Sequence, residues 1–264
     1  AVVAPADWLG EEPLAAAVAA LEAAGLAVSV DPQARQRWGR LAGDDAARAG
    51  ALTRAYADRD VGAILCARGG YGSARLVDLL DWSVVAANPK PLIGYSDLTA
   101  LLSAIHTRTG QTPWHGPILG DFADGRAPLG RQMLVAALTG GEVAAPLARL
   151  TQQAGVMVPG RAEGPLVGGN LSLLAASCGT WWQPRCRGAV LMLEEVGEAL
   201  YRVDRLLTQL DQAGWFAHLA GLIIGRPAAI EQEHEDFPED FAGLVRRWFG
   251  AAPYPVITDF PCGH

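Results

Sequence analysis

Short apolar runs of strand length alternate with segments of helical periodicity along the first half of the chain. Strands are predicted over residues 1–5, 26–30, 62–66 and 91–93. Helices are predicted over residues 14–24, 44–57, 73–80 and 98–107. Because strands that alternate with helices pair in parallel, this order predicts an α/β fold with a doubly wound, flavodoxin-like N-terminal domain.

The pattern changes in the second half of the chain. Residues 121–160 are rich in Gly, Pro and polar residues around one predicted helix at 131–138, which suits a connection between domains. Strands are then predicted over residues 189–193, 221–224 and 256–257, with helices over 201–210 and 241–249. We therefore expect an N-terminal domain at residues 1–120 and a smaller mixed α/β domain at residues 161–264.

Composition excludes several classes of protein. The net charge is −7 and the longest Lys/Arg run is the pair Arg246-Arg247, so we expect no nucleic-acid partner. Apolar runs such as residues 188–193 end well short of the roughly 18 residues of a membrane span, so we expect no membrane association. The chain begins without Met or a basic signal region, and we expect that its first residues have been trimmed. Four cysteines without a C-x-x-C pair favour a reducing, cytoplasmic setting.

A serine lies at a predicted strand-to-helix corner, in Gly94-Tyr95-Ser96-Asp97. At such a corner the side chain projects from the carboxyl edge of the sheet, and the backbone N–H groups of the first helical turn point to the same place. Ser96 therefore suits a nucleophile, but it also suits an ordinary helix N-cap. Taken alone the corner favours the cap, because caps far outnumber catalytic serines.

A second corner is rich in glycine. Arg68-Gly69-Gly70-Tyr71-Gly72-Ser73 follows the predicted strand 62–66, and its glycines allow close backbone approach while its N–H groups can bind negative charge. It is a candidate oxyanion or anion site, and the alternative is a tight turn without a ligand. A dinucleotide fingerprint requires a third glycine where this chain has Arg75, so no nucleotide cofactor is expected.

Acidic residues follow the predicted strand 189–193. Glu194 and Glu195 could orient a histidine, or they could favour the positive N-terminus of the next helix. His115 and His264 both lie in loops marked by Gly or Pro, and either could act as a general base. His106, in a helix with apolar neighbours, is expected to be structural.

Other candidates are weaker. The histidines form no cluster with metal-ligand spacing, so no metal site is expected. The acidic run at residues 231–236 is interpreted as a solvated surface. Cys66 and Cys262 are rival nucleophiles in principle, but a thiol inside an apolar strand, as at Cys66, is usually inert.

Seven motifs in this order and spacing resemble the LD-carboxypeptidases, a serine peptidase family that also includes the microcin C immunity peptidases. The resemblance covers essentially the whole chain. The motifs are Ala4-Pro5, Arg68-Gly69-Gly70-Tyr71-Gly72, Gly94-Tyr95-Ser96-Asp97, His115-Gly116-Pro117, Gly168-Gly169-Asn170-Leu171, Leu193-Glu194-Glu195 with Tyr201-Arg202-Val203-Asp204-Arg205, and Gly263-His264.

The resemblance implies a Ser-His-Glu triad shared between the two domains, with the site in the cleft between them. Ser96 would be the nucleophile, Glu194 the acid that orients the imidazole, and His264 the general base. The backbone N–H groups of Gly70 and Asp97 would form the oxyanion hole. Candidate residues for binding the substrate are Arg68, Gly69, His115 and Arg202.

The implied reaction removes the terminal D-alanine from murein tetrapeptide by cutting an L,D amide bond during cell-wall recycling, without metal or organic cofactor, in a homodimer. One alternative keeps the triad and takes an aminoacyl-nucleotide conjugate as substrate. Another is a non-catalytic α/β protein that binds a small ligand.

The chain departs from the family pattern in two places. It stops at His264, where the family continues through a short further segment, so we expect a truncation. It also carries the pair Trp181-Trp182, which is expected to pack in the core and could instead stack on a substrate ring.

Overall fold

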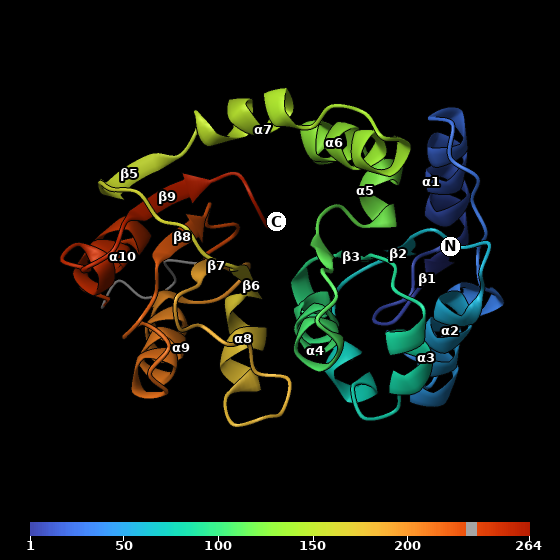
Figure 1. Cartoon of the computed structure of the whole chain (residues 1–264), viewed down its shortest axis with the longest axis horizontal. Helices are drawn as coiled ribbons and strands as arrows, with labels where there is room; N and C mark the ends of the chain where they lie inside the picture. Colours follow the sequence, from blue (N-terminus) through green and yellow to red (C-terminus); the bar gives the residue numbers. More distant parts are fainter. Residues whose placement is uncertain (231–236) are drawn as a thin grey trace. The chain divides into compact units, whose positions relative to one another are not determined.

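The computed structural model describes residues 1–230 and 237–264. The acidic run interpreted above as a solvated surface, residues 231–236, lies outside this description. The chain divides into two compact units, Ala1–Leu147 and Ala148–His264, and each unit is built around its own sheet (Figure 1).

The sheet of the first unit consists of parallel strands in the order β1 (Val2–Val3), β2 (Ile64–Cys66), β3 (Leu92–Gly94) and β4 (Trp114–His115). Val30 adds a single parallel bridge to Val2, on the side of β1 away from β2. In chain order the segments therefore run 2-1-3-4-5, which is the flavodoxin-like arrangement with its topological switch point between β1 and β2. The strand predicted over residues 26–30 is reduced to this bridge, because the segment lies at a half-exposed edge of the sheet.

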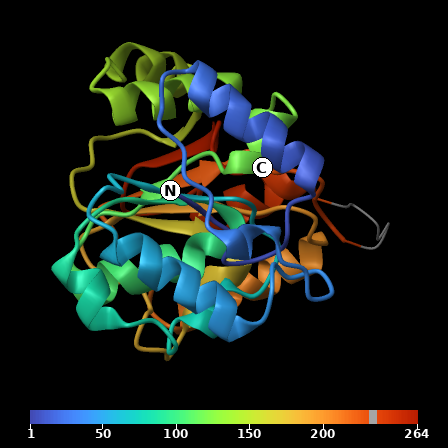
Figure 2. The ribbon, with the colours of Figure 1, turned by 90° about the vertical axis from the view of Figure 1, so that its right-hand side faces the viewer.

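Helices cover both faces of this sheet (Figures 1 and 2). One face carries α1 (Glu11–Ala23) and α5 (Leu119–Ala123), and the other carries α2 (Asp45–Ala57), α3 (Trp82–Ala87) and α4 (Thr99–Thr109). The short 3-10 helices are η1 (Pro32–Arg35), η2 (Ser73–Leu76) and η3 (Ser96–Leu98).

The helix predicted over residues 73–80 is wrong in length: it is only the 3-10 turn η2. The Asp81 side chain accepts hydrogen bonds from the backbone N–H groups of Ser83 and Val84 and so begins a separate helix, α3.

Several elements were not predicted by the sequence pattern. They include β4 and α5 in the first unit, α7 (Ala144–Thr151) and β5 (Gly155–Val158) after the predicted helix that is observed as α6 (Pro128–Thr139), and β6 (Leu166–Asn170) and α8 (Leu171–Ser177) in the second unit. Helix α7 has no buried residue and α6 has one, Leu134, so both helices lie mostly at the surface.

The second unit contains a five-stranded sheet in the order β5-β9-β8-β7-β6. Strands β6 (Leu166–Asn170), β7 (Val190–Glu194), β8 (Gly221–Gly225) and β9 (Val256–Phe260) are parallel, and β5 pairs antiparallel with β9. Helices α8 (Leu171–Ser177), α9 (Leu200–Gln212) and α10 (Phe241–Phe249) pack on the sheet around one apolar core. Because Leu191 and Leu193 of β7 face this core, the alternation of side chains along a strand turns Glu194 to the opposite face.

Candidate active site

Ser96 occupies a strained backbone position between β3 and α4. Its φ is +66°, a left-handed conformation that side chains other than glycine rarely adopt. The N-cap of the first turn is Tyr95 and that of α4 is Leu98, so the N-cap interpretation of Ser96 is wrong. A serine on a strained strand-to-helix turn is instead the geometry of a nucleophile elbow, in which the hydroxyl stands at the carboxyl edge of the sheet.

Two glycines make room for this turn. A Cβ added at Gly69 would lie 2.9 Å from Cβ of Ser96 and 3.2 Å from its Oγ. A Cβ at Gly94 would lie 2.3 Å from Cδ1 of Leu98, the residue that leads into α4. A side chain at Gly69 would overlap the serine side chain itself, and one at Gly94 would force Leu98 to move, so the glycine-rich turn packs directly against the serine side chain.

The peptide that joins Gly69 to Gly70 has a defined orientation. The backbone N–H of Asp7 donates to the carbonyl oxygen of Gly69 (3.2 Å). Because no peptide bond in the described ranges is cis, the N–H of Gly70 points to the opposite side of that peptide, away from the N–H of Asp7. Gly70 has φ +107°, and a Cβ there would lie 2.2 Å from Oδ2 of Asp7. Asp7 belongs to none of the motifs, and only its place after β1, at the edge where parallel strands end, could have indicated it.

Asp97 supplies a second N–H beside the serine. It is the second residue of η3, and backbone N–H groups in a first helical turn have no acceptor within their helix. Asp97 follows Ser96 in the chain, and the Gly69-Gly70 turn packs against the serine side chain. The two predicted oxyanion donors thus lie on segments that adjoin the same side chain.

His115 lies at the same sheet edge as the serine. It pairs with Gly94 in the register of β3 and β4, and its ring centroid lies 6.0 Å from that of Tyr95. The Tyr95 hydroxyl donates to the buried Asp121 carboxylate (3.4 Å) and so anchors the residue before Ser96. His106, in contrast, is exposed, and its Nδ1 contacts the carbonyl oxygen of Gln111 just beyond the end of α4.

In the second unit, Glu194 and His264 form a hydrogen-bonded pair. The Glu194 Oε2 to His264 Nδ1 distance is 2.9 Å, and 1% of the Glu194 side chain is exposed against 20% for His264. A carboxylate can only accept, so Nδ1 carries the hydrogen and Nε2 presents its lone pair. This is the tautomer that a general base requires.

Glycines bring the chain end to the acid. The carboxyl ends of the parallel strands β7, β8 and β9 share one edge, where Glu194, Gly225 and the segment after Phe260 lie. Gly263 has φ +86°, and a Cβ there would lie 2.4 Å from Oε2 of Glu194. The Gly263-His264 motif therefore lets the backbone pass close to the carboxylate.

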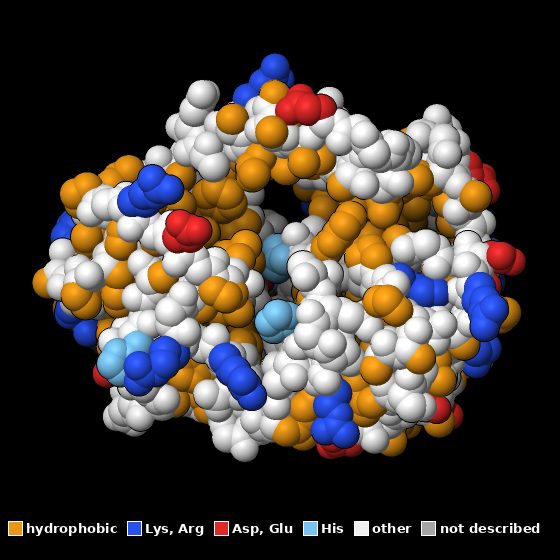
Figure 3. Space-filling model, in the orientation of Figure 1, with side chains coloured by type: hydrophobic (Ala, Val, Ile, Leu, Met, Phe, Trp, Pro, Cys, Tyr) orange, Lys and Arg blue, Asp and Glu red, His pale blue; other side chains and the backbone are white. Residues whose placement is uncertain are grey.

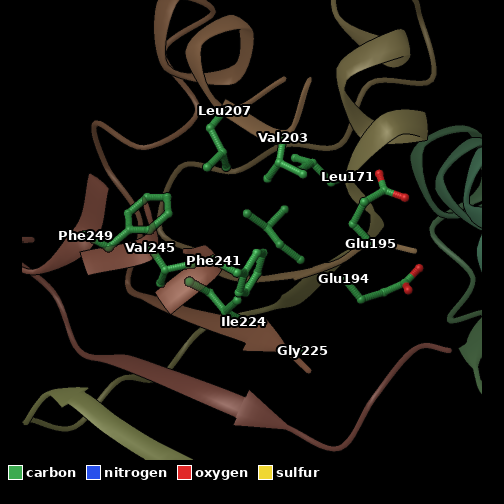
Figure 4. A pocket seen from close by; sticks show the side chains of 11 residues that line it. Leu171, Glu194, Glu195, Val203, Leu207, Ile224, Gly225, Phe241, Val245 and Phe249 are labelled. Atoms are coloured by element: carbon green, nitrogen blue, oxygen red, sulfur yellow. The ribbon is translucent and has the colours of Figure 1, made fainter. Parts of the chain in front are cut away.

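Glu195 makes different hydrogen bonds from those of Glu194. It accepts hydrogen bonds from Nδ2 of Asn170 (2.9 Å), from the backbone N–H and hydroxyl of Ser172 (2.8 and 2.6 Å), and from the N–H of Val196 (2.9 Å). Its oxygens are thus engaged at the start of α8. Figure 4 shows both carboxylates turned away from the apolar side chains, such as Phe249, that line the pocket behind them. The structure therefore assigns Glu195 to the support of α8.

The two candidate arginines differ in their surroundings. Arg202 donates to the Tyr201 hydroxyl (3.0 Å) and lies 3.5 Å from the Glu198 carboxylate. Arg68 is exposed on the glycine-rich turn, and no carboxylate among residues 1–230 and 237–264 forms an ion pair with it. On the face shown in Figure 3, Lys and Arg side chains are dispersed rather than gathered into one patch.

Neither rival thiol suits a nucleophile. Burial raises the pKa of Cys66 far above its ordinary value. Burial, reinforced by the charge of Glu194, raises the pKa of Cys262 to about 12. The two tryptophans differ in exposure. Trp182 is 6% exposed and packs in the core as expected, whereas Trp181 is 38% exposed, so the prediction of core packing was wrong for Trp181.

Among residues 1–230 and 237–264, no group of three or more His, Cys, Asp or Glu side chains could hold a metal ion. No helix there combines the length and apolar character needed to cross a membrane.

A strained serine beside a glycine-rich turn, and a histidine held by a buried carboxylate, are groups that acyl-transfer hydrolases use. Comparisons with known proteins agree. The LD-carboxypeptidase N-terminal domain matches residues 1–116 and the LD-carboxypeptidase C-terminal domain matches residues 163–264. The chain belongs to the LD-carboxypeptidase family of peptidases, as its motifs predicted.

Relatives over the whole chain carry carboxypeptidase names. The chain is 38% identical to the probable murein peptide carboxypeptidase of Bacillus subtilis, covering 100% of this chain and 82% of the relative. It is 35% identical to the murein tetrapeptide carboxypeptidase of Pseudomonas aeruginosa, covering 100% and 87%. These names support a general carboxypeptidase function for this chain.

Solved structures share the two-domain α/β fold. The muramoyltetrapeptide carboxypeptidase of Oxalobacter formigenes has a TM-score of 0.83 at 27% identity, over 100% of this chain and 88% of its own. The protein MccF, solved in complex with glutamyl sulfamoyl guanosine, has a TM-score of 0.86 at 20% identity, over 99% and 86%. The predicted fold class is confirmed.

Proposed function

We propose that this protein is a serine-type LD-carboxypeptidase that releases the terminal D-alanine of murein tetrapeptide. The observation that carries the proposal is the 2.9 Å hydrogen bond between the buried Glu194 carboxylate and His264 Nδ1, because it leaves Nε2 ready to accept a proton. In this proposal the hydroxyl that gives up its proton is that of Ser96, which lies on a strained turn. The names of the relatives from Bacillus and Pseudomonas support the substrate class.

In this mechanism Ser96 Oγ attacks the carbonyl carbon of the L,D amide while His264 Nε2 takes the hydroxyl proton. The N–H groups of Gly70 and Asp97 stabilise the oxyanion, and Glu194 stabilises the imidazolium. His264 then gives its proton to the departing amine of D-alanine. Water, activated by the same imidazole, hydrolyses the acyl-enzyme and restores the Ser96 hydroxyl.

Arg68 is our candidate for binding the carboxylate of the terminal D-alanine. A carboxypeptidase must recognise this group, and a guanidinium binds it through two parallel hydrogen bonds. Arg68 lies on the turn that packs against Ser96, and its charge has no ion-pair partner among the described residues. Arg202 is less suited, because Glu198 and Tyr201 already engage it.

The test is D-alanine release from murein tetrapeptide by the purified protein. Ser96→Ala should abolish release, whereas Ser29→Ala, which changes an exposed serine in the same unit, should leave it unchanged. Release by the wild type that persists at full rate in Ser96→Ala would reject the serine mechanism. The proposal includes a cytoplasmic homodimer, and light scattering of the purified protein gives its oligomeric state.

An aminoacyl-nucleotide substrate is the second candidate. The observation that favours it is Trp181, whose partly exposed ring offers a surface on which a base could stack. Cleavage of an aminoacyl sulfamoyl nucleotide without release of D-alanine would select this candidate. If neither substrate is cleaved and ligand binding survives Ser96→Ala, the protein is a non-catalytic binder.

A further inference from the structure

A buried arginine, Arg48, forms a hydrogen bond with the last residue of the glycine-rich turn. Arg48, on α2, is 0% exposed, and its Nη1 donates to the carbonyl oxygens of Pro5 (2.6 Å) and Gly72 (3.0 Å). Its Nη2 forms an ion pair with Asp45. Gly72 has φ +104°, and a Cβ there would lie 3.0 Å from Nη1, so glycine is needed for the guanidinium to reach this carbonyl.

A buried carboxylate, that of Asp97, accepts a hydrogen bond from the N–H of the peptide that joins Gly72 to Ser73. Asp97 is 4% exposed, and its Oδ2 accepts the backbone N–H of Ser73 (2.8 Å). The Ser73 hydroxyl donates to the carbonyl oxygen of Asp97 (2.5 Å). Burial raises the pKa of Asp97, while hydrogen bonds from Ser73 and from the backbone of Gly72 act in the opposite direction.

The carbonyl of Gly72 and the N–H of Ser73 belong to one peptide unit. Arg48 holds its oxygen and Asp97 holds its nitrogen, so both ends of this peptide make charge-assisted hydrogen bonds, which are about twice as strong as neutral ones. Stability alone is a poor explanation for such an arrangement, because apolar residues often replace buried ions at no cost. A geometric role explains it better.

The turn needs such restraint because three of its four residues from Gly69 to Gly72 are glycine, the residue with the greatest backbone freedom. The Asp7 N–H holds the carbonyl of Gly69 at one end. The peptide of Gly72 and Ser73 is held at the other end. Gly70, the proposed oxyanion donor, lies between these two fixed points.

We propose that Arg48 and the carboxylate of Asp97 are positioning residues for the hydrolysis. By holding the peptide between Gly72 and Ser73, they set the position of the Gly70 N–H relative to the N–H of Asp97. The inference rests on the proposed function, because it concerns the stabilisation of the oxyanion that forms when Ser96 attacks.

The experiment compares Arg48→Met and Arg48→Lys with Arg54→Met, a matched control on the same helix whose exposed guanidinium pairs with Asp31. Four quantities are measured: kcat and KM for D-alanine release, the rate at which a fluorophosphonate labels Ser96, and the unfolding temperature. We expect Arg48→Met to lower kcat and the labelling rate about 100-fold, as for loss of one oxyanion donor, with KM nearly unchanged. Arg48→Lys should recover part of this loss, and Arg54→Met should match the wild type.

A folded Arg48→Met variant with wild-type kcat and labelling rate would overturn the inference. If Arg48→Met does not fold, Asp97→Ala carries the test: it removes the acceptor of the Ser73 N–H, and a folded variant with wild-type labelling would overturn the inference equally. The proposed function fails separately. A wild-type protein that neither releases D-alanine nor is labelled at Ser96 would contradict both the proposed function and the positioning role. An active wild type whose variants keep its kcat and labelling rate would contradict only the positioning role.

Discussion

Replacing Gly263 by alanine should disable the acid-base pair while leaving the protein folded. Gly263 has φ +86°, and its new Cβ would lie 2.4 Å from Oε2 of Glu194, well inside van der Waals contact. The left-handed backbone costs about 1–2 kcal/mol for alanine, which a folded domain tolerates. The overlap must move the carboxylate or His264, and a displacement of about 1 Å in a catalytic group costs about 100-fold in rate. We therefore expect kcat/KM for D-alanine release to fall by at least that factor.

A matched control separates backbone strain from overlap. Gly214 has φ +79°, and no atom lies within 4 Å of an added Cβ there. Gly214→Ala should lower the unfolding free energy by a similar amount, about 1–2 kcal/mol, with kcat/KM unchanged. Urea unfolding and D-alanine release, measured on both variants, give the two quantities. A folded Gly263→Ala variant with wild-type kcat/KM would refute the assignment of Glu194 and His264 as the acid-base pair.

Three other predictions concern neighbouring groups. Glu194→Gln should reduce kcat by up to about 10⁴-fold, as loss of the orienting acid does in serine triads. Glu195→Gln should mainly destabilise the fold by about 1–3 kcal/mol, because an amide nitrogen replaces one of the two oxygens that accept hydrogen bonds from Asn170 and Ser172. Gly69→Ala should block fluorophosphonate labelling of Ser96, because the added Cβ would lie 2.9 Å from the serine Cβ. Cys262 has a pKa of about 12 against an ordinary 9.0, so at pH 8 its thiolate fraction and its alkylation rate by iodoacetamide should be about 1,000-fold lower than for a free thiol.

Each of these three predictions has a control or an outcome that would contradict it. Equal losses of kcat in the two glutamate variants would contradict the division of roles. Gly62→Ala, where an added Cβ meets nothing within 4 Å, serves as the control for Gly69→Ala and should be labelled normally. Mass spectrometry of alkylated peptides follows Cys262, and alkylation at the rate of a free thiol would contradict the raised pKa of this half-buried thiol.

Much of the fold follows from local patterns. Helix α10 has the predicted bounds, and β2, β3, β7 and β8 begin and end within two residues of the predicted strands, because buried strands of a parallel sheet are short apolar runs. Elements at the surface or at a sheet edge, such as α7 and residues 26–30, were missed or overestimated. Both segments lie at the surface, since α7 has no buried residue and residues 26–30 are partly or fully exposed.

The residues of the candidate site were likewise predicted only in part. The resemblance of seven motifs to a known family pointed to Ser96, Glu194 and His264, whereas the residues alone left Glu195 and His115 as alternatives. Arg48 was not found, although an arginine among the buried positions Ala49, Ala51 and Leu52 of an alanine-rich helix was a signal of a buried ion. No local pattern could reveal its partners, since Pro5 and Gly72 are 43 and 24 positions away.

The sequence by itself determined the class of fold, the family and the short set of residues that can carry chemistry, since these depend on periodicity and on motifs read along the chain. The resemblance implied Glu194 rather than Glu195 as the acid, but only the tertiary structure gave the physical reason, since the two residues are adjacent in the chain and identical in chemistry. The alternation of a strand sends one carboxylate to His264 and the other to the start of α8. The tertiary structure likewise showed that Ser96 lies on a strained turn and is not a helix cap, because the sign of its φ is set by what packs around the turn.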